Sequence, residues 1–344
     1  MQHPIHYCSY FDHRYLARAL CLYDSLQEHS PEFVWHVLAL SESCHDILSE
    51  LNLPNIKTTS LAELELAQPE LLEAKANRNI VEYYFTLTSG YCRYLIDHVG
   101  QDSLLTYLDS DLYFFDSPEP IIRELDGASV GIIEHRFSQP NREMVQYGRF
   151  NVGWVSFRND PQGRDCLNDW YSKCLDWCYD RLEETRFADQ KYLNNWPVDF
   201  PGVHIIQHRG ANIGPWNVAE FPLKTTPPNP HPPVAEDGTP LVFAHFQYIR
   251  RLGFRIFTTG FDAYNIQLAQ RKQIASQIYH PYLRHFQKRQ ESVEEYLRQE
   301  KQLKHIELRQ TARMLDSYRP LDLVCFPYKC ASNLWRLNWI RIGR

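Results

Sequence analysis

Apolar residues in the first half of the chain follow two patterns. Short continuous runs indicate buried strands, and longer segments with an apolar residue every three or four positions indicate helices with one buried side. The predicted strands are Ile5–Phe11, Phe33–Leu40, Ser103–Leu108, Ala128–Glu134 and Phe150–Phe157. The predicted helices are Tyr15–Gln27, a helix that begins near Ser43, Asn79–Val99 and Ser117–Leu125.

Strands that alternate with helices of this length predict an α/β fold with a mostly parallel sheet and helices on its faces. Ligands of such folds gather at the carboxyl ends of the strands. Polar residues that directly follow a predicted strand are therefore the first candidates for chemistry.

The second half of the chain has a less regular pattern. Helices are predicted at Pro161–Leu182 and Thr185–Asn195, and a strand at Leu241–Phe246. Pro222–Pro240 contains seven prolines, which predicts a loop because proline lacks a backbone donor and interrupts helices and sheets.

Charge divides the chain into two parts. Residues 263–344 carry 15 Lys and Arg against 7 Asp and Glu, although the net charge of all 344 residues is −6. The pattern beyond Asp262 is long, charged and helical, so we expect one domain over residues 1–260 and a basic helical extension over residues 261–344. The acidic main domain argues against nucleic acid as a partner, because no basic stripe crosses it.

Composition also predicts a location. No basic segment followed by an apolar one is found at the start, and no stretch reaches the roughly 18 apolar residues of a membrane span. Nine cysteines, an odd number without a CxxC pair, favour reduced thiols and a cytoplasmic protein.

The last segment, Tyr318–Arg344, combines aromatic and basic residues such as Trp335, Trp339, Arg336 and Arg341. This combination is typical of a surface that binds anionic lipid headgroups. It predicts peripheral contact with the inner face of the cytoplasmic membrane. The alternative is a terminal helix that packs on the body of the protein through its tryptophans.

Two carboxylates, Asp109 and Asp111, interrupt the apolar run 104–115. Burying an unpaired carboxylate costs several kcal/mol or forces it to take up a proton. At the end of a strand, however, both side chains can turn toward one divalent cation, and oxygen ligands of this kind suit Mg or Mn. The alternative is a buried structural pair or a turn.

His245 lies in the last apolar strand before the extension. A single histidine in a strand is often a core residue with satisfied hydrogen bonds. Next to an acidic pair, its imidazole could instead complete the ligand set of a Mn ion, which accepts both oxygen and nitrogen.

Three further segments have both a structural and a functional interpretation. Asn151 and Gly153 begin a strand, where the amide could bind a sugar hydroxyl and the glycine could permit close backbone approach. Asp189 and Gln190 either bind a ligand or form the acidic first turn of a helix. The polar turn 211–217 could line an acceptor pocket or be a structural loop.

Taken in order, these segments resemble the retaining glycosyltransferases of the GT-A type, particularly glycogenin and the bacterial lipopolysaccharide galactosyltransferases. The resemblance covers roughly residues 5–255 and begins at Tyr7–Asp12. The residues that match the motifs of this family are Asp109, Ser110, Asp111, Asn151, Gly153, Asp189, Gln190 and His245.

The resemblance implies a GT-A catalytic domain over residues 1–260, with a Rossmann-like sheet. Its activity would be the metal-dependent transfer of a sugar, with retention, from a nucleoside diphosphate donor, a UDP-sugar, to a hydroxyl. The acceptor would be a glycan or a lipid-linked glycan, as in lipopolysaccharide synthesis.

The resemblance also implies roles for single residues. Asp109, Asp111 and His245 would bind Mn(II) or Mg(II). The donor sugar would contact three residues with catalytic roles, namely Asn151, Asp189 and Gln190. The nucleotide would contact Ser9, Tyr10, Tyr15, Ser110 and Gly153.

The basic residue that binds the diphosphate is ambiguous in this sequence. Arg93 has about the spacing from Asp109 that the family shows, but Ser89 also aligns with the family's basic residue. The family's lysine after the metal-binding histidine is absent here, and Arg250 or Arg251 would replace it.

Two other functions are compatible with this type of fold. A sugar-nucleotide nucleotidyltransferase would carry a glycine-rich loop after the first strand, and Ser9–Arg14 contains no glycine. A non-catalytic carbohydrate-binding protein would have no reason to keep buried carboxylates.

Overall fold

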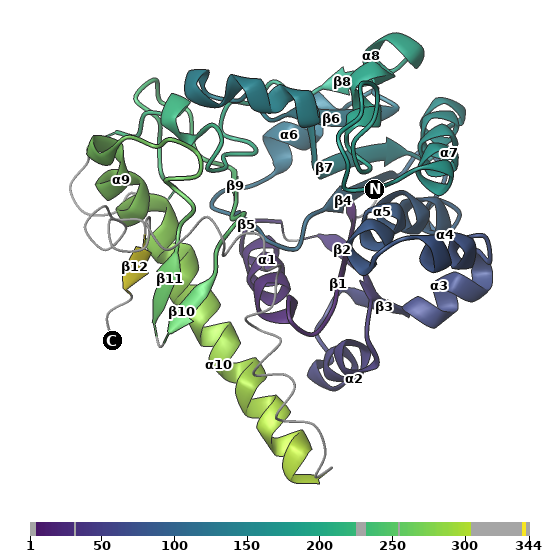
Figure 1. The fold of residues 1–344 in the computed structure, drawn as a ribbon, viewed down its shortest axis with the longest axis horizontal. Coiled ribbons are helices and arrows are strands. Elements are labelled where there is room, and N and C mark those ends of the chain that lie inside the picture. Colours follow the sequence, from purple (N-terminus) through teal and green to yellow (C-terminus); the bar gives the residue numbers. More distant parts are fainter. Residues whose placement is uncertain (1–4, 31, 225–231, 254, 304–338, 342–344) are drawn as a thin grey trace.

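The structure is a computed structural model, and it describes residues 5–30, 32–224, 232–253, 255–303 and 339–341. Its centre is a seven-stranded sheet with the order β3-β2-β1-β4-β7-β6-β8 (Figure 1). The strands are β1 Ile5–Phe11, β2 Phe33–Ala39, β3 Ile56–Ser60, β4 Leu104–Leu108, β6 Val130–Glu134, β7 Phe150–Arg158 and β8 Val203–Ile205.

The sheet is mostly parallel, as the sequence predicts. The strands β3, β2, β1 and β4 pair in parallel, and so do β6 and β8. Only β7 runs in the opposite direction among these strands, because it pairs antiparallel with both β4 and β6. The predicted α/β fold class is therefore confirmed.

Helices cover both faces of the sheet, and side-chain N-caps start α2, α3, α5 and α7. Asn79 and Glu82 form a capping box that starts α5, and Asp160 caps α7. The helices before residue 200 are α1 Leu16–His29, α2 Glu42–Leu51, α3 Leu61–Ala67, α4 Leu71–Asn77, α5 Ile80–Ile96, α6 Glu119–Glu124, α7 Pro161–Asp176 and α8 Trp196–Asp199.

Alternate residues of β1 belong to two different hydrophobic cores. Tyr7 packs into a core with α1 and α10 (His280–Leu303), whereas Cys8 packs into a core with α3, α4, α5 and α7. This period of two shows that the two cores lie on opposite faces of the sheet. Figure 1 shows the two groups of helices on either side of the strands.

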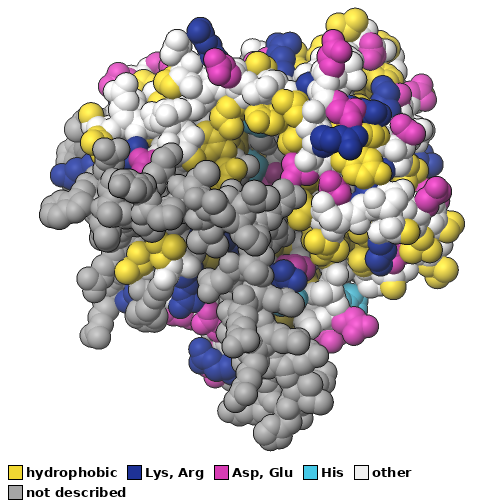
Figure 2. All heavy atoms as spheres, in the orientation of Figure 1, with side chains coloured by type: hydrophobic (Ala, Val, Ile, Leu, Met, Phe, Trp, Pro, Cys, Tyr) yellow, Lys and Arg dark blue, Asp and Glu magenta, His cyan; other side chains and the backbone are white. Residues whose placement is uncertain are grey.

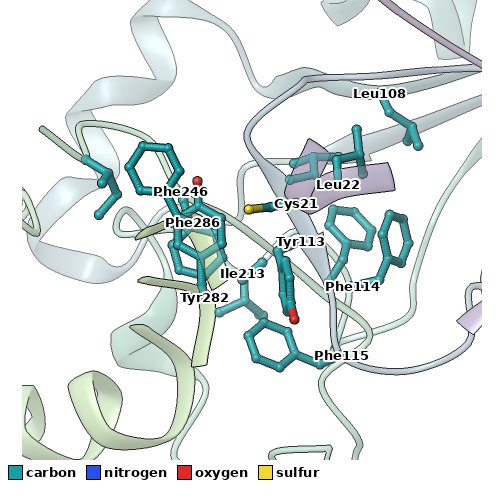
Figure 3. Packing of buried hydrophobic residues seen from close by; sticks show 14 of the residues in the cluster. Cys21, Leu22, Leu108, Tyr113, Phe114, Phe115, Ile213, Phe246, Tyr282 and Phe286 are labelled. Atoms are coloured by element: carbon teal, nitrogen blue, oxygen red, sulfur yellow. The ribbon is translucent and has the colours of Figure 1, made fainter. Parts of the chain in front are cut away.

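The described end of the chain joins the first core. Helix α9 (Leu268–Ile274) continues through a π-helical turn, Ala275–Tyr279, into α10. Tyr282 and Phe286 of α10 lie beside Phe246, and the rings of Phe246 and Tyr282 are stacked 3.8 Å apart (Figure 3).

Two small sheets lie beside the central one. Strand β5 (Leu112–Phe114) pairs antiparallel with β9 (Phe243–His245). A three-stranded antiparallel sheet contains β10 (Arg251–Gly253), β11 (Ile256–Thr258) and β12 (Trp339–Arg341). The described part of the tail is thus a strand. The rest of Tyr318–Arg344, on which a membrane contact or a terminal helix was expected, lies outside the described residues.

The structure corrects the helices predicted between residues 177 and 190. Helix α7 ends at Asp176 because Trp177 adopts an extended conformation. In the predicted helix Thr185–Asn195, only Lys191–Asn195 is helical, as a 3-10 turn. Ala188 has a φ of +46°, a left-handed conformation that is incompatible with a continuous helix.

The surface over α3, α4 and α7 is neither uniformly charged nor uniformly hydrophobic. On the face shown in Figure 2, acidic, basic and hydrophobic side chains are interspersed over this part of the molecule. Among the described residues, no helix is long and apolar enough to cross a membrane.

Candidate metal centre

The end of β4 places the two predicted carboxylates at the carboxyl edge of the sheet. Asp109 directly follows β4, and Asp111 directly precedes β5. Because β5 pairs with β9 so that Leu112 lies opposite His245, the imidazole lies beside both carboxylates. The Nε2 atom of His245 is 3.0 Å from Asp111 Oδ1 and 3.6 Å from Asp109 Oδ2.

This cluster has the donor set of a divalent cation site. One ligand atom from each of Asp109, Asp111 and His245 lies within 4.8 Å of the others. The three side chains are 33%, 16% and 7% exposed, so the cluster is partly open to ligands. Two carboxylates and one imidazole fit Mn(II), which accepts both ligand types, or Mg(II).

The three groups shift one another's pKa values. Burial and the neighbouring Asp111 raise the pKa of Asp109 against the opposing effect of His245. Burial also opposes ionisation of Asp111, but His245, with a smaller effect of Arg18, lowers its pKa. The carboxylates raise the pKa of His245 in spite of its burial. A cation that binds Nε2 would therefore displace a proton, which makes binding dependent on pH.

Gly153 allows the backbone of β7 to approach this cluster. Its carbonyl accepts a hydrogen bond of 3.1 Å from the Asp109 backbone. A Cβ atom at this position would lie 2.4 Å from Asn151 Oδ1 and 2.9 Å from His245 Nδ1. Any larger residue would therefore displace the groups that surround the candidate metal.

Asn151 lies next to the cluster, but other protein groups bind its amide. Its Oδ1 accepts a 2.7 Å hydrogen bond from the Gly153 backbone, and its Nδ2 lies 2.9 Å from His135 Nε2. Burial, together with the nearby His245, lowers the pKa of His135 to about 3, so this imidazole is neutral and can accept the amide proton. His135 is not among the residues predicted from the sequence.

Asp189 lies near the cluster, outside any helix. Burial is the main cause that raises its pKa to about 7; a hydrogen bond from Thr88 opposes this, and Asp109 adds to it. The carbonyl of Asp189 accepts a hydrogen bond of 2.9 Å from Trp170 Nε1. Gln190 turns elsewhere, since its Nε2 donates to the Tyr147 carbonyl over 3.0 Å.

Two tyrosines connect the carboxylate side of the site with Asp189. The hydroxyl of Tyr107 donates to Asp109 Oδ1 over 2.8 Å, and the hydroxyl of Tyr10 is 3.2 Å from Thr88 Oγ1. Their rings lie 5.7 Å apart. Tyr10 was expected at the site, but Tyr107 was not, because a tyrosine inside an apolar strand gives no functional signal.

The other residues predicted to contact the nucleotide differ in how far their side chains are exposed to solvent. Ser9 is fully buried, and its hydroxyl donates to the Leu108 carbonyl over 2.7 Å and accepts from Trp35 Nε1 over 3.0 Å. Ser110 is also buried, whereas Tyr15 is 40% exposed just before α1. Ser9 thus ties β1 to the end of β4, and Tyr15 is open to a ligand.

The structure separates Arg93 from the cluster. Arg93 pairs with Asp97 on the same helix over 2.7 Å. It lies five residues after Thr88, which is about 7 Å further along the helix and on a different side. The backbone of Arg250 pairs with Thr258, and the side chain of Arg251 pairs with Glu294 of α10 over 2.6 Å.

The turn 211–217 packs Trp216 against the candidate metal ligand. The indole meets the His245 ring edge-on at 5.2 Å and the His135 ring at 5.3 Å. The Asn217 side chain holds the turn, because it donates to the carbonyls of His135 and Asn212. No sequence motif indicated this support.

Two bacterial proteins are similar to this chain over most of its length. The uncharacterized proteins YfnD and YfnF of Bacillus subtilis (strain 168) are 30% and 31% identical over 258 and 257 residues. The matches cover 74% and 73% of this chain and 79% and 82% of the relatives. No protein-family model matches the chain.

Solved structures with a similar arrangement include two sugar transferases. The galactosyltransferase LgtC, in complex with donor and acceptor sugar analogs, has a TM-score of 0.47 and 19% identity, over 71% of this chain and 87% of LgtC. Mouse xyloside xylosyltransferase 1 in its apo form has a TM-score of 0.42 and 15% identity, over 61% and 87%.

Proposed function

The chain belongs to the family of YfnD and YfnF, and we propose that it is a metal-dependent glycosyltransferase. The donor is a nucleoside diphosphate sugar, a UDP-sugar, and the acceptor is a hydroxyl of a glycan or lipid-linked glycan. Retention at the sugar and a cytoplasmic location remain predictions from the sequence.

One observation supports this proposal above all others. Asp109, Asp111 and His245 come together at the carboxyl edge of the sheet, with a partly exposed face. Two carboxylates and a neighbouring imidazole are costly without a counter-charge. A divalent cation that also binds phosphate oxygens supplies this charge.

Different residues of this chain would bind the metal ion and shape the space beside it. When bound, Mn(II) or Mg(II) stabilises the negative charge that develops on the diphosphate leaving group. Asp109, Asp111 and His245 hold that ion. Asn151 fixes the backbone of Gly153 and the ring of His135, which keeps the space beside His245 in shape.

Asp189 would contact the donor sugar. With a pKa of about 7, its carboxyl group can donate or accept a hydrogen bond from a sugar hydroxyl near neutral pH. Gln190, bound to the Tyr147 carbonyl, would hold the loop that carries Asp189 rather than contact the sugar.

A thermal-shift titration tests the proposal. We expect one of UDP, GDP, CDP and dTDP to raise the melting temperature only when Mn(II) is present, because a ligand that binds the native state stabilises it. Asp109→Ala should remove this shift, and Asp97→Asn, which alters a carboxylate paired with Arg93, should keep it. No shift with any nucleotide, or a full shift in Asp109→Ala, would contradict the proposal.

Turnover separates the remaining possibilities. Release of UDP from a UDP-sugar in the same samples identifies a transferase with water as a poor acceptor. Binding without turnover would indicate a carbohydrate-binding protein, and formation of a nucleotide sugar from a sugar phosphate would indicate a nucleotidyltransferase.

A further inference from the structure

We infer that Arg18 of α1 binds the diphosphate of the donor, opposite the cluster of Asp109, Asp111 and His245. This inference rests on the proposed function and identifies the basic residue that the sequence left ambiguous. Four observations support it. Arg18 lies beside Asp111, it forms no ion pair with a described carboxylate, two aromatic rings orient its guanidinium, and other candidate arginines already have acidic partners.

The register between α1 and β5 places Arg18 beside Asp111. The Phe114 backbone donates to Ser25 Oγ over 3.1 Å, which fixes the two elements at one point. Arg18 lies seven residues before Ser25, which is about 10 Å along the helix. Asp111 lies three residues before Phe114, which is also about 10 Å along the extended strand. Arg18 and Asp111 are therefore at the same level of the two elements. Between these points Cys21 and Tyr113 lie together (Figure 3).

Arg18 is a half-buried cation that forms no ion pair with a described carboxylate. Its Nη2 donates to the carbonyl of Ile249 over 2.8 Å, and its charge lowers the pKa of the nearby Asp111. Partial burial of a charge outside an ion pair is unfavourable, and an anionic ligand would relieve this cost.

Two aromatic rings orient the guanidinium. Its central carbon lies 4.6 Å from the ring centre of Tyr15 and 5.1 Å from that of Phe286. Tyr15 is the exposed residue expected at the base of the nucleotide, so Arg18 follows it by one turn of α1. A nucleotide that stacks on Tyr15 would therefore extend its phosphates past Arg18 toward Asp111.

Two of the other arginines considered for this role already form ion pairs. Arg93 pairs with Asp97 and Arg251 with Glu294. Ser89 is fully buried, and its hydroxyl donates to the Thr86 carbonyl. A guanidinium suits the proposed task, because its planar fork donates two parallel hydrogen bonds to phosphate oxygens.

A comparison of ligands with and without phosphate tests the role of Arg18. Wild type, Arg18→Ala and Arg18→Lys are titrated with UDP and with uridine at saturating Mn(II), and isothermal titration calorimetry measures both affinities, with uridine at high concentration because it binds more weakly. In Arg18→Ala, we expect the affinity for UDP to fall about tenfold to a hundredfold and that for uridine to stay within twofold. Arg18→Lys should recover part of the loss. Arg14→Ala, which removes an exposed arginine paired with Asp12, is the matched control and should bind both as wild type does.

The possible failures are distinguishable. Unchanged UDP affinity in Arg18→Ala would overturn the inference and leave the proposed function intact. An equal loss of UDP and uridine would also overturn it, because Arg18 would then only support Tyr15 or the loop at Ile249. If the wild type binds no nucleoside diphosphate with Mn(II), both the inference and the proposed function fail. Melting temperatures without ligand show whether each variant is folded.

Discussion

The metal cluster and the groups around it differ in charge. Asp109, Asp111 and His245 face one another as ionisable groups whose pKa values depend on their partners. Around them, burial keeps His135 neutral and raises the pKa of Asp189 to about 7. The charged cluster suits a cation and phosphates, whereas a neutral imidazole and a carboxyl group that titrates near neutral pH suit the hydroxyl groups of a sugar. This difference teaches that donor binding and sugar positioning can be altered separately.

The largest effect is expected in the charged cluster. Asp111→Asn removes one charged ligand and the negative charge that lies 3.0 Å from His245 Nε2. We expect transfer or donor hydrolysis to fall about a hundredfold or more, and the thermal shift with Mn(II) and UDP to disappear. A Mn(II) titration followed by a turnover assay measures both effects. If Asp111→Asn keeps more than half of the wild-type activity, Asp111 is not a metal ligand that the reaction needs.

Gly153→Ala tests the close approach of the β7 backbone to the metal cluster. The new Cβ would lie 2.4 Å from Asn151 Oδ1, so we expect a loss of about 1–3 kcal/mol in the free energy of unfolding. Metal affinity should fall as well. The control is Gly90→Ala in α5, where a Cβ makes only 3.4 Å contacts and helix propensity favours alanine. Urea unfolding compares them, and equal stability of both variants would contradict the close approach.

Asp189→Asn tests the ionisation of Asp189 through the dependence of stability on pH. Because the pKa of Asp189 is about 7 in the folded protein and near 3.8 when unfolded, its contribution to stability is complete below pH 3.8 and is lost as pH rises through 7. The melting temperature of Asp189→Asn relative to wild type should therefore increase between pH 5 and pH 8. A difference that stays constant over this range would show that Asp189 is ionised throughout.

The smallest effect is expected from Trp216→Phe. This change removes part of the ring that meets both His245 and His135 edge-on, and such contacts contribute about 0.5–1.5 kcal/mol. We expect Mn(II) affinity to fall a few-fold with the fold intact. Trp177→Phe, in the segment after α7, is the control and should leave Mn(II) affinity unchanged; equal effects would contradict a positioning role for Trp216.

The sequence predicted what local patterns encode. Ile5–Phe11 coincides with β1, and Asp109 and Asp111 are recognisable because carboxylates interrupt an apolar strand. Strand β3 gave no such signal, since Thr59 is its one buried residue. The chain at Ala188 adopts a left-handed conformation that helix-like composition did not reveal.

The parts of the site that were missed depend on tertiary contacts. His135 and Arg18 lie in unremarkable sequence, and Trp216 belongs to a turn whose role the sequence left open. Only the packing of separate elements brings these residues to the cluster. The pairing of Leu112 with His245 decides which imidazole faces the carboxylates, and no periodicity within either strand encodes it.

That same pairing ties the complete metal site to a late step in the synthesis of the catalytic-edge strands. Asp111 is synthesised 134 residues before His245, so a growing polypeptide that has formed β1 to β4 still lacks the third ligand. Cation affinity would therefore rise only after β9 has docked on β5. A partly synthesised chain would hold the two carboxylates without the complete ligand set.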